Sequence, residues 1–170
     1  VDQWKPTLYK CTSCKLVFSE SIGINFADKY TEVMDQAYLD QINFKKKTFE
    51  LFFTKIKKYL KNDHKVLEIG SYYGILGNLI KPCVKEYYGL ELSTHAAAYA
   101  KKNFDLNIIG DHLEDHLKKN NKYDLIIMTD VIEHLDNPFE VINLINQNLS
   151  KEGNLILSTF NFDSFFSKVM

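Results

Sequence analysis

Apolar side chains follow two alternating patterns along this chain. In residues 30–60 they recur at spacings of three, four and seven between lysines, without Gly or Pro, which predicts an amphipathic helix. After a polar break at residues 61–63, short apolar runs alternate with helical stretches. The runs predict strands at residues 65–69, 86–92, 106–109, 123–129 and 154–159.

The stretches between these strands show helix boundary signals. A helix over 74–81 ends at Pro82, an alanine-rich helix after Ser93 or Thr94 runs to about Asn103, and Pro138 begins a helix to about Leu149. Residues 151–153 are a predicted turn, and a last helix is expected over 162–170. Alternating helices and apolar strands predict a Rossmann-like, doubly wound α/β fold, with a mostly parallel sheet and helices on both faces.

The first part of the chain, residues 1–28, has weak periodicity and is expected to form a small non-helical module before a domain over 29–170. The 170 residues carry a net charge of −1, and all 21 basic residues are lysines. Without arginine forks, a nucleic-acid partner is not expected. No apolar run reaches the roughly 20 residues of a membrane helix, and three cysteines do not make a disulfide framework, so a cytoplasmic protein is expected.

Candidate chemistry begins at the end of the first predicted strand of the sheet. Gly70 permits a sharp turn there, and Gly74 permits a close approach before the next helix. Tyr72 stands where the dinucleotide fingerprint needs its second glycine, and Glu68 is acidic, so both disfavour a phosphate ligand. A plain turn that binds nothing is the alternative.

A second candidate is the carboxylate at the end of the next strand. Glu91 lies 21 residues beyond Gly70, close to the roughly 20 residues that place an acid on ribose hydroxyls in such sheets. We expect its side chain to face an open cleft, so that its removal would barely change stability. A solvated loop acid is the alternative.

Five segments together resemble the successive motifs of class I S-adenosylmethionine (SAM)-dependent methyltransferases. They are VLEIGSYYG, YYGLELS, IIGDHLED, YDLIIMTDVIEHLDNP and GNLILST. The resemblance implies SAM as cofactor, S-adenosylhomocysteine (SAH) as product, and a list of cofactor-binding residues: Glu68, Gly70, Ser71, Tyr72, Gly74, Glu91, Leu92, Asp111, His112, Thr129 and Asp130. It also implies that two further strands of the class I sheet are missing after Thr159, as in a protein truncated at its C-terminal end.

An acidic and histidine cluster follows the fourth predicted strand of the sheet. Asp130, Glu133 and His134 would share one face if this loop is helical. Two carboxylates and an imidazole could bind a divalent metal or supply a general base. The arrangement resembles metal-binding motifs of some O-methyltransferases, but a structural or substrate-orienting role is the favoured interpretation. Glu133 and His134 are the candidate catalytic residues.

The pair Cys11-x-x-Cys14 resembles half of a zinc ribbon. A structural zinc needs four ligands, so these two thiols make an incomplete site. Bacterial sugar methyltransferases begin with two such pairs, and this chain resembles the second of them.

These observations predict an enzyme that transfers the methyl group of SAM to a small-molecule acceptor, with a nucleotide-linked sugar or polysaccharide precursor as one candidate. The alternatives are a metal-dependent O-methyltransferase, a nicotinamide-dependent oxidoreductase and a non-catalytic cofactor-binding module.

Overall fold

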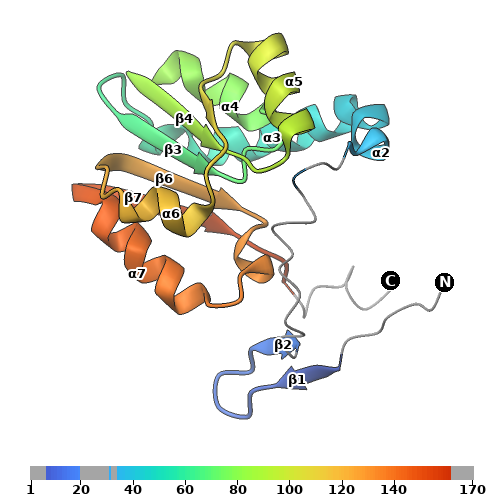
Figure 1. The fold of residues 1–170 in the computed structure, drawn as a ribbon, viewed down its shortest axis with the longest axis vertical. Helices are drawn as coiled ribbons and strands as arrows, with labels where there is room; N and C mark the ends of the chain where they lie inside the picture. The colour runs from blue at the N-terminus through green and yellow to red at the C-terminus, as the bar shows by residue number, and fades with distance from the viewer. Residues whose placement is uncertain (1–6, 20–30, 32–33, 162–170) are drawn as a thin grey trace. The chain divides into compact units, whose positions relative to one another are not determined.

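The structure, a computed structural model, describes residues 7–19, 31 and 34–161 (Figure 1). The chain divides into two units, one of residues 26–159 and one of residues 1–25 and 160–170. The helix expected over 162–170 lies outside the described residues.

Two helices and a short turn replace the single helix expected in residues 30–60. They are α2 (Gln36–Asp40), α3 (Ile42–Ile56) and the 3₁₀ turn η1 (Lys57–Tyr59). The Asp35 carboxylate accepts the backbone N–H of Tyr38 at 2.9 Å, and this N-cap starts α2. The backbone leaves helical geometry at Gln41, which separates α2 from α3.

Five strands of the larger unit form a sheet in the order β5-β4-β3-β6-β7, and every neighbouring pair is parallel. The strands are β3 (Lys65–Ile69), β4 (Glu86–Leu90), β5 (Ile108–Ile109), β6 (Tyr123–Thr129) and β7 (Leu149–Ser158). In chain order, β4 and β5 are added on one side of β3, and β6 and β7 are then added on its other side. This topological switch point lies between β3 and β6, where open α/β sheets form ligand crevices.

Helices cover both faces of the sheet, as the sequence predicts. Helices α3, α4 (Ile75–Ile80) and α5 (Thr94–Phe104) pack on one face around Val66, Leu125 and Ile127. Helices α6 (Leu113–Lys118) and α7 (Pro138–Asn148) pack on the other face, around Leu67, Ile126 and Met128 (Figure 1). The doubly wound α/β fold is therefore confirmed.

Most predicted boundaries agree with the structure, but some elements differ. Strand β4 ends at Leu90 and not at residue 92 as predicted. Strand β7 begins at Leu149 and includes the predicted turn at 151–153, where the pairing with β6 is irregular. Strand β5 is only two residues long. Helix α6 was not expected, and the 3₁₀ turn η2 (Lys81–Cys83) follows α4.

No helix among the described residues is long and apolar enough to cross a membrane.

Candidate cofactor-binding site

The loop between β3 and α4 lies at the switch point of the sheet. Gly70 has a φ of +71°, and a Cβ on it would lie 2.5 Å from the Val131 side chain that follows β6. Only a glycine therefore lets the two loops approach each other here. Tyr72 and Gly74 are also left-handed, with φ of +47° and +75°. For a tyrosine, this conformation costs about 1–2 kcal/mol.

The backbone amides of this glycine loop are bound within the protein. Gly70 and Ser71 donate to the Leu90 carbonyl at 2.9 and 3.2 Å, Gly74 donates to the Ser71 carbonyl at 2.8 Å, and Tyr72 donates to Glu91 Oε2 at 2.8 Å. Loops that bind phosphates present such amides to the ligand. This loop uses them internally beside the Glu91 carboxylate, which disfavours a pyrophosphate and hence the oxidoreductase alternative.

Glu91 links the glycine loop to the start of α5. Its Oε2 accepts from Tyr72, and its Oε1 accepts the backbone N–H of Ser93 at 2.7 Å. Ser93 in turn caps α5, as the sequence predicts. The side chain is 8% exposed, and burial raises the pKa of Glu91. The expectation of a side chain in an open cleft is therefore wrong, because the two amides draw the carboxylate inward.

The Glu91 carboxylate retains acceptor capacity beyond these two bonds. An ionised carboxylate offers about four lone-pair sites. The two backbone amides fix its position, so that the remaining lone pairs could accept the two hydroxyls of a ribose. A 2′-phosphate at this position would meet the negative charge of the carboxylate.

Glu68 lies beneath the glycine loop rather than at its surface. It is 2% exposed, and the Tyr87 hydroxyl donates to its Oε2 at 2.5 Å. Burial raises the pKa of Glu68 to about 8. A Cβ on Gly77 would lie 2.2 Å from the Tyr87 oxygen, so this glycine makes room for the pair. Sequence reasoning missed Tyr87, because nothing in a strand pattern shows where its hydroxyl ends.

The other expected cofactor residues have diverse surroundings. Ser71 is buried against β4, where a Cβ on Gly89 would lie 2.6 Å from its Oγ. Leu92, two residues after β4, and Thr129, the last residue of β6, are both half-buried. Asp111 follows β5, and its carboxylate accepts a hydrogen bond from Lys119 Nζ and lies 3.4 Å from His116 Nδ1. His112 is exposed at the start of α6.

The cluster after β6 does not form one helical face. Asp130 is left-handed, with a φ of +53°, and only the 3₁₀ turn η3 (Ile132–His134) follows it. The expected shared face is therefore wrong. Glu133 Oε2 accepts the Thr159 hydroxyl at 3.0 Å. Partial burial and the Glu133 carboxylate raise the pKa of Asp130.

Metal ligands do not converge in the part of the chain that the structure describes: it holds no group of three His, Cys, Asp or Glu side chains placed for a metal ion. Asp130, Glu133 and His134 are all described, so they do not assemble the metal site that the O-methyltransferase alternative requires.

The cysteine pair lies in the other unit, in the turn of a hairpin. Strands β1 (Leu8–Lys10) and β2 (Val17–Ser19) are antiparallel, and the Cys11 amide donates to the Leu16 carbonyl at 2.8 Å. Both cysteines are free thiols. Backbone hydrogen bonds from Cys14 and Ser13 lower the pKa of Cys11. The turn thus favours a thiolate, although within the described residues it supplies only two ligands.

A segment that sequence reasoning did not connect with the site contacts the glycine loop. The Asp35 carboxylate accepts the Tyr72 hydroxyl, and the Tyr38 ring packs against Tyr72 and Tyr73. No sequence signal places residues 35–38 beside residues 72–73, because the contact depends on how α2 docks.

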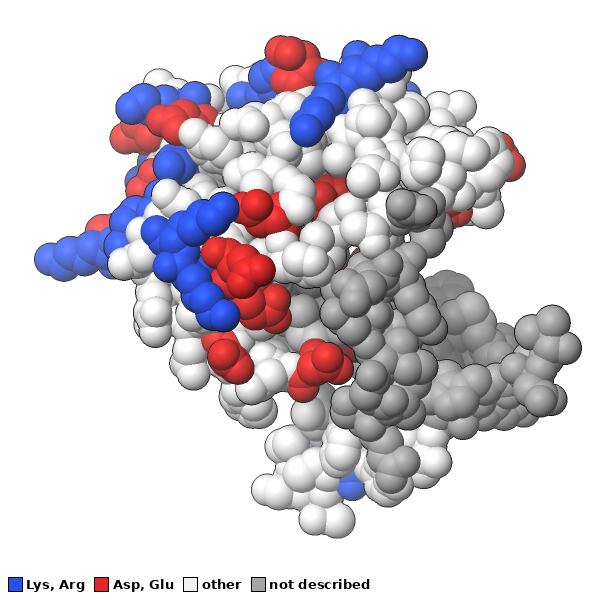
Figure 2. All heavy atoms as spheres, in the orientation of Figure 1, with Lys and Arg blue, Asp and Glu red and all other residues white. Residues whose placement is uncertain are grey.

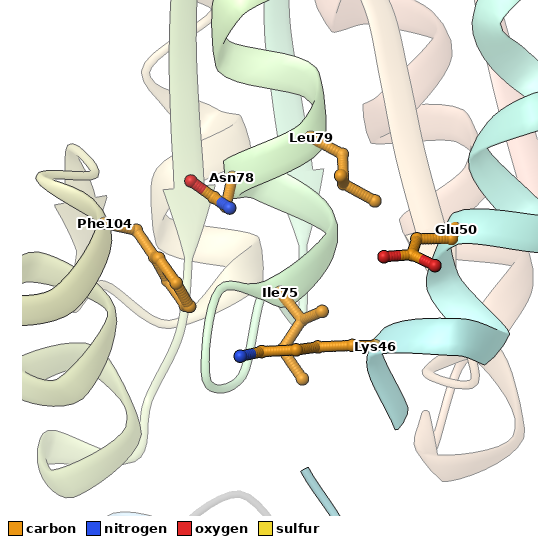
Figure 3. A pocket seen from close by; sticks show the side chains of 6 residues that line it. All are labelled: Lys46, Glu50, Ile75, Asn78, Leu79 and Phe104. Carbon is orange, nitrogen blue, oxygen red and sulfur yellow. The ribbon is translucent and has the colours of Figure 1, made fainter. Parts of the chain in front are cut away.

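An open hollow of about 180 Å³ lies away from this edge, among α3, α4 and the last residue of α5 (Figure 3). Lys46, Glu50 and Asn78 line it together with Ile75, Leu79 and Phe104. It includes neither Glu91 nor the loop over 70–74, so it is not the candidate cofactor site.

On the face shown in Figure 2, lysine and acidic side chains lie beside one another. The described residues of this face therefore form no extended basic field for a polyanion, in agreement with the net charge of −1.

Comparison with known proteins agrees with this geometry. The chain is 31% identical over 107 residues to a ubiquinone biosynthesis O-methyltransferase of Glaesserella parasuis, covering 57% of this chain and 45% of that protein. It is 39% identical over 67 residues to the protein of that name in Rickettsia canadensis, covering 39% and 28%. The chain thus spans less than half the length of these relatives.

Solved structures show the same fold. A SAM-dependent methyltransferase from Archaeoglobus fulgidus superposes with a TM-score of 0.68 at 20% identity, covering 79% of this chain and 63% of that one. The plantazolicin methyltransferase BpumL in complex with SAH gives a TM-score of 0.60 at 23% identity, covering 76% and 52%. The family profile described as "Methyltransferase domain" matches residues 36–168. Since this match spans more than three quarters of the chain, the protein belongs to the family of SAM-dependent methyltransferase domains.

Proposed function

We propose that this protein transfers the methyl group of SAM to a small-molecule acceptor, and that the adenosyl part of SAM binds at the carboxyl edge between β3 and β4. One observation supports this most strongly. The Glu91 carboxylate is fixed by the Tyr72 and Ser93 amides at 2.8 and 2.7 Å and retains lone pairs for a ribose.

The residues around the crevice have proposed roles that follow from their positions. The backbone of Gly70, Ser71, Tyr72 and Gly74, above the buried Glu68, would lie along the methionine and sugar part of the cofactor. Leu92 would pack on the adenine, with Asp111 and His112 at its edge, and Thr129 and Asp130 would face the methionine end.

When bound, SAM supplies a sulfonium methyl that is already activated for in-line transfer to a nucleophile. The protein therefore needs chiefly to align the acceptor and exclude water. Glu133 and His134 are exposed beyond β6, where either could accept a proton from an acceptor hydroxyl.

The acceptor class is proposed from the relatives. Both curated relatives are named O-methyltransferases of ubiquinone biosynthesis, which favours a hydroxyl group on a small molecule. A sugar acceptor remains the finer hypothesis, favoured by the cysteine pair and by the bulky Tyr72 in the glycine loop.

An assay of SAH release tests the proposal. The protein is incubated with SAM and either hydroxylated quinone precursors, nucleotide-linked sugars or no acceptor. Acceptor-dependent SAH release from one class supports methyl transfer and identifies the acceptor chemistry. SAM binding without release on either class would favour the non-catalytic module.

A further inference from the structure

The described N-terminal part of the larger unit contacts both sides of the Glu91 carboxylate. Thr31 and residues 34–41, here called the α2 segment, approach the two loops that donate to Glu91. On one side, the Thr94 amide and hydroxyl donate to the Thr31 carbonyl at 2.9 and 3.1 Å, next to Ser93. On the other side, the Tyr72 hydroxyl donates to Asp35 Oδ2 at 2.8 Å.

Tyr72 therefore has two different contacts. Its backbone N–H donates to Glu91, and its side chain reaches the α2 segment. The ring packs edge-on against Tyr38 and Tyr73, with ring centroids 4.7 Å apart in both pairs. Burial and the bond to Asp35 raise the pKa of Tyr72, so its hydroxyl stays protonated as a donor at neutral pH.

Further contacts support the same arrangement of the α2 segment. The Asp35 amide donates to the Tyr73 hydroxyl at 3.1 Å, and the Tyr38 and Tyr73 rings stack with centroids 5.1 Å apart. The Lys45 Nζ lies 5.3 Å from the centre of the Tyr38 ring. Because α2 has only five residues and no buried one, its place depends on such contacts as well as on its N-cap at Asp35.

We propose that Tyr72 is a positioning residue: through its hydroxyl bond to Asp35 it fixes the α2 segment beside the Glu91 crevice, and so controls how tightly the adenosyl cofactor is retained. This inference rests on the proposed function. It explains why a tyrosine occupies a left-handed position, φ +47°, that a glycine would adopt without strain. The side chain at this position is used to hold the α2 segment.

The test compares Tyr72→Phe with a matched control, Tyr88→Phe. Phenylalanine keeps the ring packing and removes only the hydroxyl. Tyr88 donates to Glu86 at 2.7 Å, so Tyr88→Phe removes the same kind of bond from residues of β4 outside the Glu91 crevice. Hydrogen exchange of residues 36–41 reports on the α2 segment, and SAH dissociation reports on the crevice.

We expect Tyr72→Phe to speed amide exchange in residues 36–41 and SAH dissociation by about 5- to 20-fold, the size of one partly exposed bond to a carboxylate. Tyr88→Phe should change neither rate by more than about twofold, because its ring packing is kept and the bond that it loses is to Glu86 and not to the Glu91 crevice. Asp35→Ala removes the acceptor of the Tyr72 hydroxyl together with the N-cap bond to Tyr38. The double variant Tyr72→Phe/Asp35→Ala should therefore release SAH no faster than Asp35→Ala alone, because the Tyr72 hydroxyl has already lost its partner there.

Three results would overturn the proposal: unchanged exchange in Tyr72→Phe, faster exchange with unchanged SAH dissociation, or additive effects in the double variant. Failure of the wild-type protein to bind SAH would instead refute the proposed function. The exchange measurement would still decide whether Tyr72 holds the α2 segment.

Discussion

The carboxyl edge of the sheet has two halves that differ in how their polar groups are bonded. In the half after β3 and β4, the two Glu91 oxygens accept the backbone amides of Tyr72 and Ser93. Glu68 accepts the Tyr87 hydroxyl. Apart from the half-buried Tyr72, all of these residues are buried. In the half after β6, Asp130, Glu133 and His134 are all exposed. Asp130 has a left-handed backbone, and Glu133 and His134 lie in the 3₁₀ turn η3.

This difference indicates which part of the site is formed before any ligand binds. The first half has fixed acceptors, and its ligand chemistry can be inferred from the geometry. The second half presents exposed side chains, and their roles depend on which molecule accepts the methyl group.

Glu91→Ala should weaken SAH binding by about tenfold to a few hundredfold, because a carboxylate–ribose bond is worth roughly 1.5–3 kcal/mol. It should also lower the free energy of unfolding by about 1–3 kcal/mol, since the Tyr72 and Ser93 amides lose their acceptor. Titration calorimetry and thermal unfolding measure the two effects. Glu91→Gln, which keeps one acceptor oxygen, should lie between Glu91→Ala and wild type. Unchanged SAH affinity in Glu91→Ala would remove Glu91 from the site.

Glu68→Gln tests the buried half through pH. The folded pKa of Glu68 is raised from 4.5 to about 8, so its contribution to stability is full below pH 4.5, falls as the pH rises and is lost above about pH 8. Wild type should therefore lose stability relative to Glu68→Gln by on the order of 4 kcal/mol between pH 5 and pH 9, since the loss accrues over about three pH units at about 1.4 kcal/mol each. Chemical denaturation at several pH values measures this difference. Parallel pH profiles for the two proteins would show that Glu68 ionises normally.

The hairpin of the smaller unit carries two candidate zinc ligands. Because Cys11 and Cys14 supply two of the four ligands that a structural zinc needs, we expect weakly held zinc at well under one ion per chain. Elemental analysis after dialysis against a chelator measures it. One tightly held zinc per monomeric chain would contradict this expectation.

The smallest effect is expected for chelation at the exposed half. If Asp130, Glu133 and His134 do not form a metal centre, EDTA should leave SAH affinity and methyl transfer unchanged. Loss of transfer on EDTA treatment, with recovery on adding Mg²⁺ or Mn²⁺, would revive the metal-dependent alternative.

The sequence predicts the sheet well and the site only in part. Strand β6 and the cap of α5, expected at Ser93 or Thr94 and found at Ser93, follow from local patterns, because apolar runs and capping side chains act over a few residues. The position of Glu91 at a strand end is predictable for the same reason. Its burial is not, because it depends on the Tyr72 amide from another loop.

The contacts that were missed connect distant segments. The bond of Asp35 with Tyr72 spans 37 positions and that of Tyr87 with Glu68 spans 19. Neither pair has a periodic or motif signal. The prediction of a helical face at Asp130 is wrong because Asp130 itself has a left-handed backbone, which is incompatible with a helix at that residue. Residue spacing alone does not reveal this conformation.

We propose that the half of the edge containing Glu91 binds an adenosyl cofactor and not a dinucleotide. Parallel titrations of the wild-type protein with SAH and with NAD distinguish these two ligands. We predict one SAH per chain, with a dissociation constant in the range of about 1 µM to 1 mM typical of enzyme ligands, and much weaker binding of NAD. Tight binding of NAD without binding of SAH would contradict the account.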